Sequence, residues 1–139
     1  MKALGIVACG AMLMSFGAAA GSIPNTPLLG YQCYTVDGDR LGLTQQDYFS
    51  GRKFPLILGT PEADAEVVGR VAVILYVKWP LKIENGFVEV LYHTDRLGWV
   101  PRDDIRPLRK ADGTSGGCKL WSGKDGIMFA LDPGVAVGN

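Results

Sequence analysis

The sequence predicts an all-β protein built as a small antiparallel barrel. Short apolar or alternating segments of strand length follow one another closely, and none continues with helical periodicity over several turns. The 19 Gly and 8 Pro residues separate these segments with turns. With 139 residues, the chain is long enough for one domain.

Composition excludes two classes of protein. The 14 basic and 14 acidic side chains cancel, so the chain lacks the positive charge of a general nucleic-acid binder. Its 47% hydrophobic and 20% charged residues can form a buried core, which excludes intrinsic disorder.

Residues 1–20 have the pattern of a cleaved secretory signal peptide. Lys2 precedes an uncharged stretch, residues 3–20, which ends in three alanines. A membrane anchor is the competing interpretation, but the many small residues and the cleavage-site pattern favour processing after Ala20. Processing at Cys9 as a lipoprotein is a second alternative, although the apolar stretch before it is short. We therefore expect a periplasmic or secreted protein with no membrane span after processing.

Two cysteines remain after that processing, Cys33 and Cys118. A pair near opposite ends of a small exported domain usually forms a disulfide. The bond would close a loop of about 85 residues, worth roughly 4.5 kcal/mol in the chain-entropy model. A redox pair is the alternative, but neither cysteine stands in a Cys-X-X-Cys motif.

Residues 21–53 are expected to form an N-terminal extension with a β-hairpin. Residues 31–36 alternate as a strand, an Asp-Gly-Asp turn follows, and residues 40–43 return as the partner strand. Thr44 is a suitable cap for one helical turn at residues 45–47.

Residues 54–108 are expected to form the barrel. Asn85-Gly86, between two alternating segments, is the strongest hairpin signal in the chain. The strands expected in or beside this region are residues 53–58, 71–77, 81–84, 87–92 and 97–101. Residues 109–139 are expected to add a C-terminal hairpin, from residues 118–121 and 127–131, and a loose tail after Asp132.

The central region resembles a bacterial Src-homology-3-like domain. The resemblance rests on the Asn-Gly-Phe-Val-Glu-Val segment at residues 85–90, the Gly-Trp-Val-Pro segment at 98–101 and the Arg-Asp-Asp-Ile segment at 102–105. It covers residues 54–108, and it implies a five-stranded barrel with one helical turn at 102–105 and a closing strand at 106–108.

The resemblance also implies a binding function. Extracellular members of this family often recognise cell-wall peptides or partner proteins, and eukaryotic relatives bind proline-rich segments. Phe87 stands where that family has an aromatic platform, and Pro101 matches its groove proline. Asp104 replaces a groove tyrosine, and a polyproline ligand needs several aromatic slots. A different partner surface is therefore favoured.

We expect a few aromatic side chains to form that surface. Strand alternation turns Val88 and Val90 toward the core and leaves Phe87 at the rim. The competing expectation is that the flanking hairpins cover these rings. The expected ligand-binding residues are Tyr76, Trp79, Phe87, Pro101 and Arg102, with Glu89 and Arg96 in the polar rim.

The sequence offers little for catalysis, metal or cofactor binding. His93 is the only histidine, and no thiol remains free if Cys33 and Cys118 pair. Asp37 and Asp39 lack the remaining ligands of a calcium loop, and no phosphate-binding loop is present. We expect no catalytic residue, no metal and no cofactor.

These observations predict an exported, non-catalytic binding module for a cell-wall peptide or an envelope protein. An inhibitor or immunity-type protein that blocks a partner enzyme is the alternative. A small hydrolase is a third class, and it would need His93 close to a Ser or Asp in the folded chain.

Overall fold

The structure is a computed structural model, and it describes residues 26–93, 95–114, 116–135 and 137. The expected signal peptide, residues 1–20, and Cys9 lie outside the described residues. Within the described segments, no helix has the length and apolar character needed to cross a bilayer.

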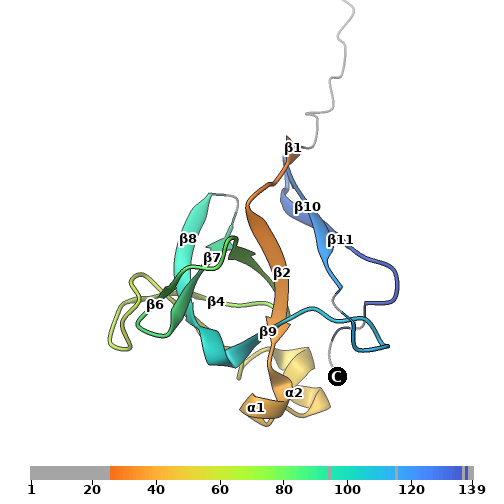
Figure 1. The fold of residues 1–139 in the computed structure, drawn as a ribbon. Helices are drawn as coiled ribbons and strands as arrows, with labels where there is room; N and C mark the ends of the chain where they lie inside the picture. The colour runs from red at the N-terminus through yellow and green to blue at the C-terminus, as the bar shows by residue number, and fades with distance from the viewer. Residues whose placement is uncertain (1–25, 94, 115, 136, 138–139) are drawn as a thin grey trace, which may run out of the picture.

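The described residues form two antiparallel sheets and three short helical segments (Figure 1). The larger sheet has the strand order β4-β3-β8-β7-β5-β2-β9, with β6 beside β7, and the smaller has the order β1-β10-β11. The prediction of an all-β protein is confirmed. The elements are β1 (Thr26–Pro27), β2 (Tyr31–Val36), α1 (Gly38–Leu41), α2 (Gln45–Ser50), β3 (Leu56–Leu58), β4 (Val67–Arg70), β5 (Ile74–Lys78), β6 (Ile83–Glu84), β7 (Phe87–Tyr92), β8 (Arg96–Pro101), the 3-10 helix η1 (Arg102–Asp104), β9 (Ile105–Pro107), β10 (Cys118–Gly123) and β11 (Gly126–Leu131).

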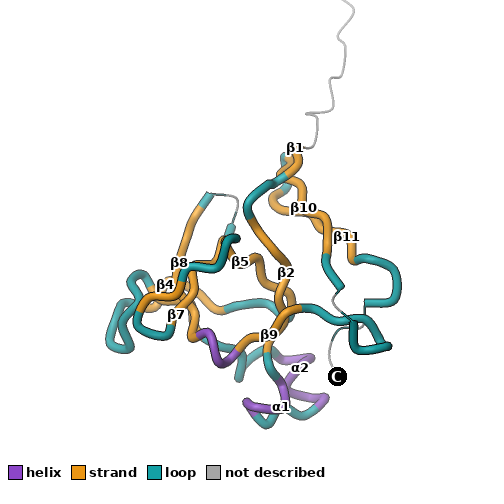
Figure 2. Tube along the Cα trace, viewed as in Figure 1, coloured by secondary structure: helices purple, strands orange, loops and turns teal. Residues whose placement is uncertain are grey.

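The predicted hairpin at residues 31–43 is wrong in its second half. Gly38–Leu41 forms helix α1, because the Asp37 carboxylate caps it by accepting a hydrogen bond from the Arg40 N–H at 3.1 Å. Strand β2 therefore does not pair with the segment that follows it in the sequence. It pairs with β5 on one side and with β9 on the other. It therefore belongs to the same sheet as most of residues 54–108, as the strand-coloured tube in Figure 2 shows.

Helix α2 confirms the predicted turn after Thr44 and extends it to Ser50. The Thr44 hydroxyl accepts a hydrogen bond from the Asp47 N–H, and the Asp47 carboxylate accepts one from the Thr44 N–H at 2.9 Å. This reciprocal capping box satisfies two N–H groups that a short helix would otherwise leave unpaired.

The inner face of the larger sheet holds the main core. Val88 and Val90 of β7 are buried there, as predicted, beside Val77 of β5 and Val100 of β8. Gly98 of β8 is required by the packing, because a Cβ at that position would stand 2.3 Å from the Ile57 Cγ2 atom.

A second core joins the two sheets. Leu120 of β10 packs with Ile74, Leu108 and Cys33, and the hairpin of β10 and β11 confirms the one predicted near the C-terminus. The expected loose tail after Asp132 is wrong for the described residues, since Gly134 accepts a hydrogen bond from the Ala111 N–H at 3.0 Å and Val135 bridges Lys110.

The short 3-10 helix η1 and strand β9 stand where the resemblance implied a helical turn and a closing strand. Strand β9 pairs with β2, from the segment assigned to the N-terminal extension. Strand β4 was not predicted; it pairs with β3, and the register shifts between Ile57 and Leu58.

Candidate functional site

The structure brings three of the five predicted surface residues together. Phe87 of β7 lies directly opposite Pro101 of β8, and both are half-buried. The exposed Arg102 follows, with its N–H donating to the Gly86 carbonyl at 2.9 Å. These three residues form a small patch at the end of the hairpin that the Asn85-Gly86 turn closes.

Tyr76 lies at the other end of β7 from this patch. It is opposite Leu91, four residues from Phe87, which corresponds to about 13 Å along a strand. Its half-buried ring packs against Phe129 of β11, with ring centroids 6.2 Å apart. The C-terminal hairpin therefore covers part of this ring, as the competing expectation held.

Trp79 lies in a cleft beside the disulfide. The residue follows β5 directly, its N–H donates to the Gly30 carbonyl at 2.8 Å, and it is 44% exposed. Uncovered indole surface next to a hollow is typical of recognition sites. Among the five predicted residues, Trp79 is the one that lines this cleft.

The cleft has a volume of about 610 Å³, within the range of ligand-binding pockets. It surrounds the first half of β2 and extends to the segment that precedes β10. Its lining residues are Tyr31, Gln32, Cys33, Tyr34, Trp79, Pro107, Leu108, Gly116, Gly117 and Cys118.

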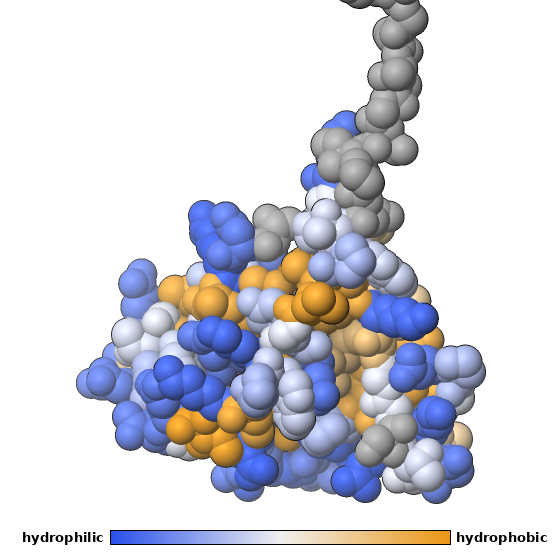
Figure 3. Space-filling model, turned by 45° about the horizontal axis from the view of Figure 1, so that its top comes forward, coloured by the Kyte–Doolittle hydropathy of each residue, from blue (hydrophilic) through white to orange (hydrophobic). Residues whose placement is uncertain are grey.

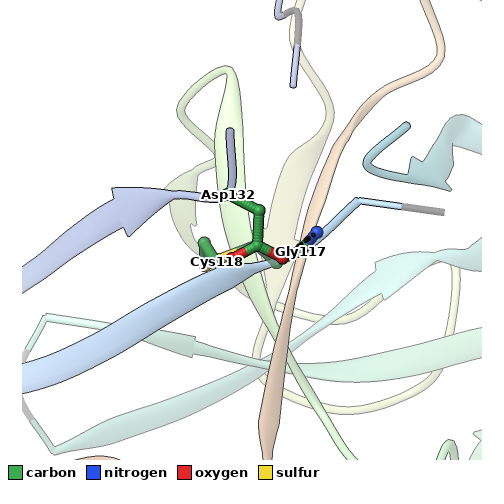
Figure 4. Close-up of a disulfide and its surroundings, with 4 residues drawn as sticks. Gly117, Cys118 and Asp132 are labelled. Atoms are coloured by element: carbon green, nitrogen blue, oxygen red, sulfur yellow. Dashed lines mark hydrogen bonds between the residues drawn. A yellow bond between two sulfur atoms is a disulfide. The ribbon is translucent and has the colours of Figure 1, made fainter. Parts of the chain in front are cut away.

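The Cys33–Cys118 disulfide forms part of the cleft wall and confirms the predicted pairing. Next to it, the Gly117 N–H donates to the Asp132 Oδ2 atom at 2.9 Å, which fixes the chain just before β10 (Figure 4). Gly116 is also needed here, because a Cβ would stand 2.5 Å from the Val135 Cγ2 atom. The wall is thus held by one covalent bond and by close backbone packing.

Two tyrosines are among the residues of the cleft, Tyr31 and Tyr34, and Tyr34 also belongs to the main core, where it is 7% exposed. Burial raises the pKa of the Tyr34 hydroxyl, and the positive charge of Arg102 opposes this shift only in part. The phenol therefore stays protonated at neutral pH and can donate a hydrogen bond. Tyr31 and Trp79 add further ring surface at the same cleft.

His93 lies outside this cleft. It has a left-handed backbone (φ 53°), its ring centroid is 5.2 Å from that of Tyr92, and it lines a second hollow of about 500 Å³ with Tyr76 and residues 124–127. Of the two residue types that the hydrolase alternative would need near His93, an Asp, Asp125, lines the same hollow, whereas no Ser is among its described lining residues. The described part of the chain also has no group of three potential metal-ligating side chains.

Apolar side chains are exposed elsewhere too, and Figure 3 shows them as separate patches among charged residues on one face. Leu29 is 86% exposed and Phe49 of α2 is 79% exposed. Neither lines the disulfide cleft. Exposure alone therefore does not single out Trp79. Leu29 also lines a hollow, a separate one of about 430 Å³, so Trp79 is distinguished only by lining the cleft beside the disulfide.

Tyr31 and Tyr34 were missed as site residues, although a signal for them existed. Tyr34 follows Cys33 directly and Tyr31 lies two residues before it, so the predicted bond to Cys118 already placed both near the segment around Gly117. Treating the disulfide as part of a site wall, and not only as a link between two segments, would have identified both tyrosines.

Comparison with known proteins gives no relative: no protein-family model, curated protein or solved structure matches this chain.

Proposed function

We propose that the protein is an exported, non-catalytic binding module that captures a peptide of the cell wall or of an envelope protein. The observation that carries the proposal is the cleft beside the Cys33–Cys118 disulfide, which the exposed Trp79 lines. Aromatic and apolar lining with a few polar groups is the usual composition of a ligand site.

Rigidity supports this role. The disulfide joins strands from the two sheets, and the cleft lies at that junction. A preformed cleft loses little conformational entropy on binding, which favours affinity for a flexible ligand. Export is supported by the pattern of residues 1–20 and by the disulfide, since such bonds persist mainly outside the cytoplasm.

The resemblance of residues 54–108 to bacterial Src-homology-3-like domains favours binding over catalysis. In that family, Phe87 and Pro101 would be part of the groove, and here they form a patch with Arg102. We assign this patch a secondary role, because Trp79 and the two tyrosines line a cleft that can enclose a ligand.

The test is capture by the purified, disulfide-bonded protein of purified sacculi and, separately, of proteins in an envelope extract. We expect wild type to retain one of these, and Trp79→Ala to lose at least tenfold in retention while its unfolding curve is unchanged. Phe49→Ala is the matched control, since it removes an exposed aromatic ring on α2 away from the cleft.

Three outcomes are informative. Equal retention by wild type and Trp79→Ala would exclude the cleft as the binding site. Retention of neither sacculi nor envelope proteins by wild type would exclude the function itself. Recovery of one tightly bound hydrolase, inhibited by the protein, would replace the proposal with the inhibitor function.

A further inference from the structure

The smaller sheet carries apolar side chains on both of its faces. Residues directly opposite one another in an antiparallel sheet project from the same face. Across β1, β10 and β11, Pro27 lies opposite Trp121, and Trp121 lies opposite Met128. These three residues belong to the outer face, because the next residue along β10, Leu120, points the other way into the second core.

The neighbouring row of the outer face is also apolar, apart from one lysine. Lys119 lies opposite Ala130, and Leu29, just after β1, lines the same hollow as Lys119. Within the described strands of the smaller sheet, Lys119 is the only charged residue. It is exposed, and none of the ion pairs among the described residues includes it.

This composition is typical of a covered face, yet the described chain leaves the face open. An antiparallel sheet with one solvated face normally has polar side chains on that face. Here Leu29 is 86% exposed, Met128 is 40% exposed, and Pro27 and Ala130 are exposed as well. Adjoining apolar residues of this kind mark a contact with another protein or with a membrane.

The chemistry of the outer face favours a lipid surface as the occupant. Its lone charge is positive, which suits the phosphate groups of anionic lipids. Trp121 combines a large ring with an N–H donor, and tryptophan is enriched at the boundary between the hydrocarbon and the headgroups. The lysine next to it in the row can lay its apolar stem on the patch and keep its ammonium group among the headgroups.

The course of the chain favours the same occupant. Strand β1 begins at Thr26, so only residues 21–25 separate the smaller sheet from the uncharged stretch of residues 3–20. We expect that stretch to enter a membrane during export. The smaller sheet is therefore the part of the described fold that follows it most closely in sequence.

We propose that the outer face of the smaller sheet is a membrane-contact surface, which rests peripherally on bilayers that contain anionic phospholipid. Trp121 and Met128 enter the headgroup boundary, and the Lys119 ammonium pairs with lipid phosphate. The contact crosses no bilayer, so it is compatible with a processed chain. It goes beyond the proposed function, because Trp79 lines the cleft that captures a ligand, whereas this face holds the module at a membrane.

The probe is a set of large unilamellar vesicles of phosphatidylglycerol and phosphatidylethanolamine, compared with vesicles of phosphatidylcholine alone. The protein is purified after export in its disulfide-bonded form, and its mass is measured to establish that residues 1–20 have been removed. We expect wild type to bind the anionic vesicles about fivefold more tightly than the neutral ones, with weaker binding at high salt. No binding to the anionic vesicles, or equal binding to both kinds, would overturn the proposal.

Tryptophan fluorescence locates the contact on the protein. Brominated acyl chains quench only those tryptophans that reach the lipid, and Trp99 is buried, with 9% exposure. We expect quenching in wild type and in Trp79→Phe, whereas Trp121→Phe should lose most of it. Phenylalanine keeps an aromatic ring at each position, so both variants should fold. Undiminished quenching in Trp121→Phe would show that another surface contacts the lipid, against the proposal.

Two further variants test the apolar patch and the charge. Met128→Ser and Lys119→Glu should each weaken binding to the anionic vesicles severalfold. Phe49→Ser and Arg52→Glu are the matched controls, since they make the same changes at exposed residues in or just after α2, at the end of the molecule opposite β1 (Figure 1). The controls should bind like wild type, and an equal loss in all four variants would contradict a specific face.

A second copy of the chain is the competing occupant, and the same variants detect it. A dimer in solution that Met128→Glu separates, with no vesicle binding by wild type, would assign the face to self-association and overturn membrane contact. The result is also independent of the proposed function. Vesicle binding by Trp79→Ala equal to that of wild type supports a separate role for this face, whatever that variant does to the retention of sacculi.

Discussion

Cys33 and Cys118 are 85 positions apart in the sequence, and their Cα atoms lie 5.8 Å apart across the junction of the two sheets. Cys33 stands on β2 of the larger sheet and Cys118 opens β10 of the smaller one. This separation is within the usual range for a disulfide, so the bond joins segments that the two sheets already bring together.

Removal of this bond should destabilise the protein strongly. We expect the Cys33→Ser, Cys118→Ser double variant to lose about 2–5 kcal/mol of unfolding free energy, because the unfolded chain regains the freedom of a long loop. Urea unfolding with and without reductant measures the loss. Reductant should lower the unfolding free energy of wild type to that of the double variant and leave the value of the double variant unchanged. A reductant effect on the double variant would show that the loss of stability does not come from this disulfide.

Gly98 should not tolerate even a methyl group. A Cβ there would meet Ile57 Cγ2 at 2.3 Å and the Leu58 carbonyl at 3.1 Å, so we expect Gly98→Ala to cost about 1–3 kcal/mol. Gly69→Ala is the matched control, since its Cβ would touch the same Ile57 side chain at an ordinary 3.6 Å. Equal unfolding midpoints for the two variants in urea would show that the main core can expand around β8.

Gly86 should be required for the turn between β6 and β7. Asn85 and Gly86 both have positive φ, 50° and 80°, which fits the two-residue turn that matches the twist of a hairpin. An alanine at position 86 would be strained in that conformation, and we expect Gly86→Ala to cost about 1 kcal/mol. Gly69→Ala again serves as the control. If Gly86→Ala and Gly69→Ala have the same thermal unfolding midpoint, the turn does not require glycine at position 86.

The Asp47 carboxyl should make the unfolding free energy of the protein depend on pH. Hydrogen bonds from the Thr44 N–H and hydroxyl, with a smaller contribution from Lys53, hold the pKa of the Asp47 carboxyl below its usual value. A carboxyl with a depressed pKa in the folded state stabilises the protein above its unfolded pKa, and this stabilisation is lost as the pH falls through the folded pKa. The loss therefore belongs below about pH 4.

The Asp47→Asn variant tests this assignment. Between pH 6 and pH 3, its urea midpoint should fall less than that of wild type, because the side-chain amide that replaces the carboxyl has no proton to gain. Asp112 also has a lowered pKa, through Thr114, and provides the comparison in a loop. If the urea midpoint of Asp112→Asn falls less than that of wild type between pH 6 and pH 3, and the midpoint of Asp47→Asn does not, the loss of stability in acid comes from the loop and not from the helix cap.

Local signals in the sequence predicted the elements that depend on neighbouring residues. Asn85-Gly86 predicted the hairpin of β6 and β7, Thr44 predicted the start of α2, and alternation placed Val88 and Val90 in the core. Each of these features is decided by turn geometry, a cap or a two-residue period, which a short stretch of sequence contains.

Features that depend on pairing between distant segments could not be predicted as well from the sequence. The Asp-Gly-Asp segment at residues 37–39 is compatible with a hairpin turn, and the capping bond between Asp37 and Arg40 makes it a helix start instead. The pairing of β2 with β5 and β9 follows from contacts across the sheet that no local pattern records. Similarly, the separation of Tyr76 from Phe87 became clear only from the register of β7.

The position of β2 between β5 and β9 has a consequence for how the protein folds. A strand near the start of the described chain obtains its second neighbour from Ile105–Pro107, so the sheet forms only after long loops have closed. Such non-local topologies fold slowly, on the scale of milliseconds to seconds. A nascent chain that has not yet reached residue 107 would hold β2 with one side bare, and this intermediate is the one most exposed to aggregation.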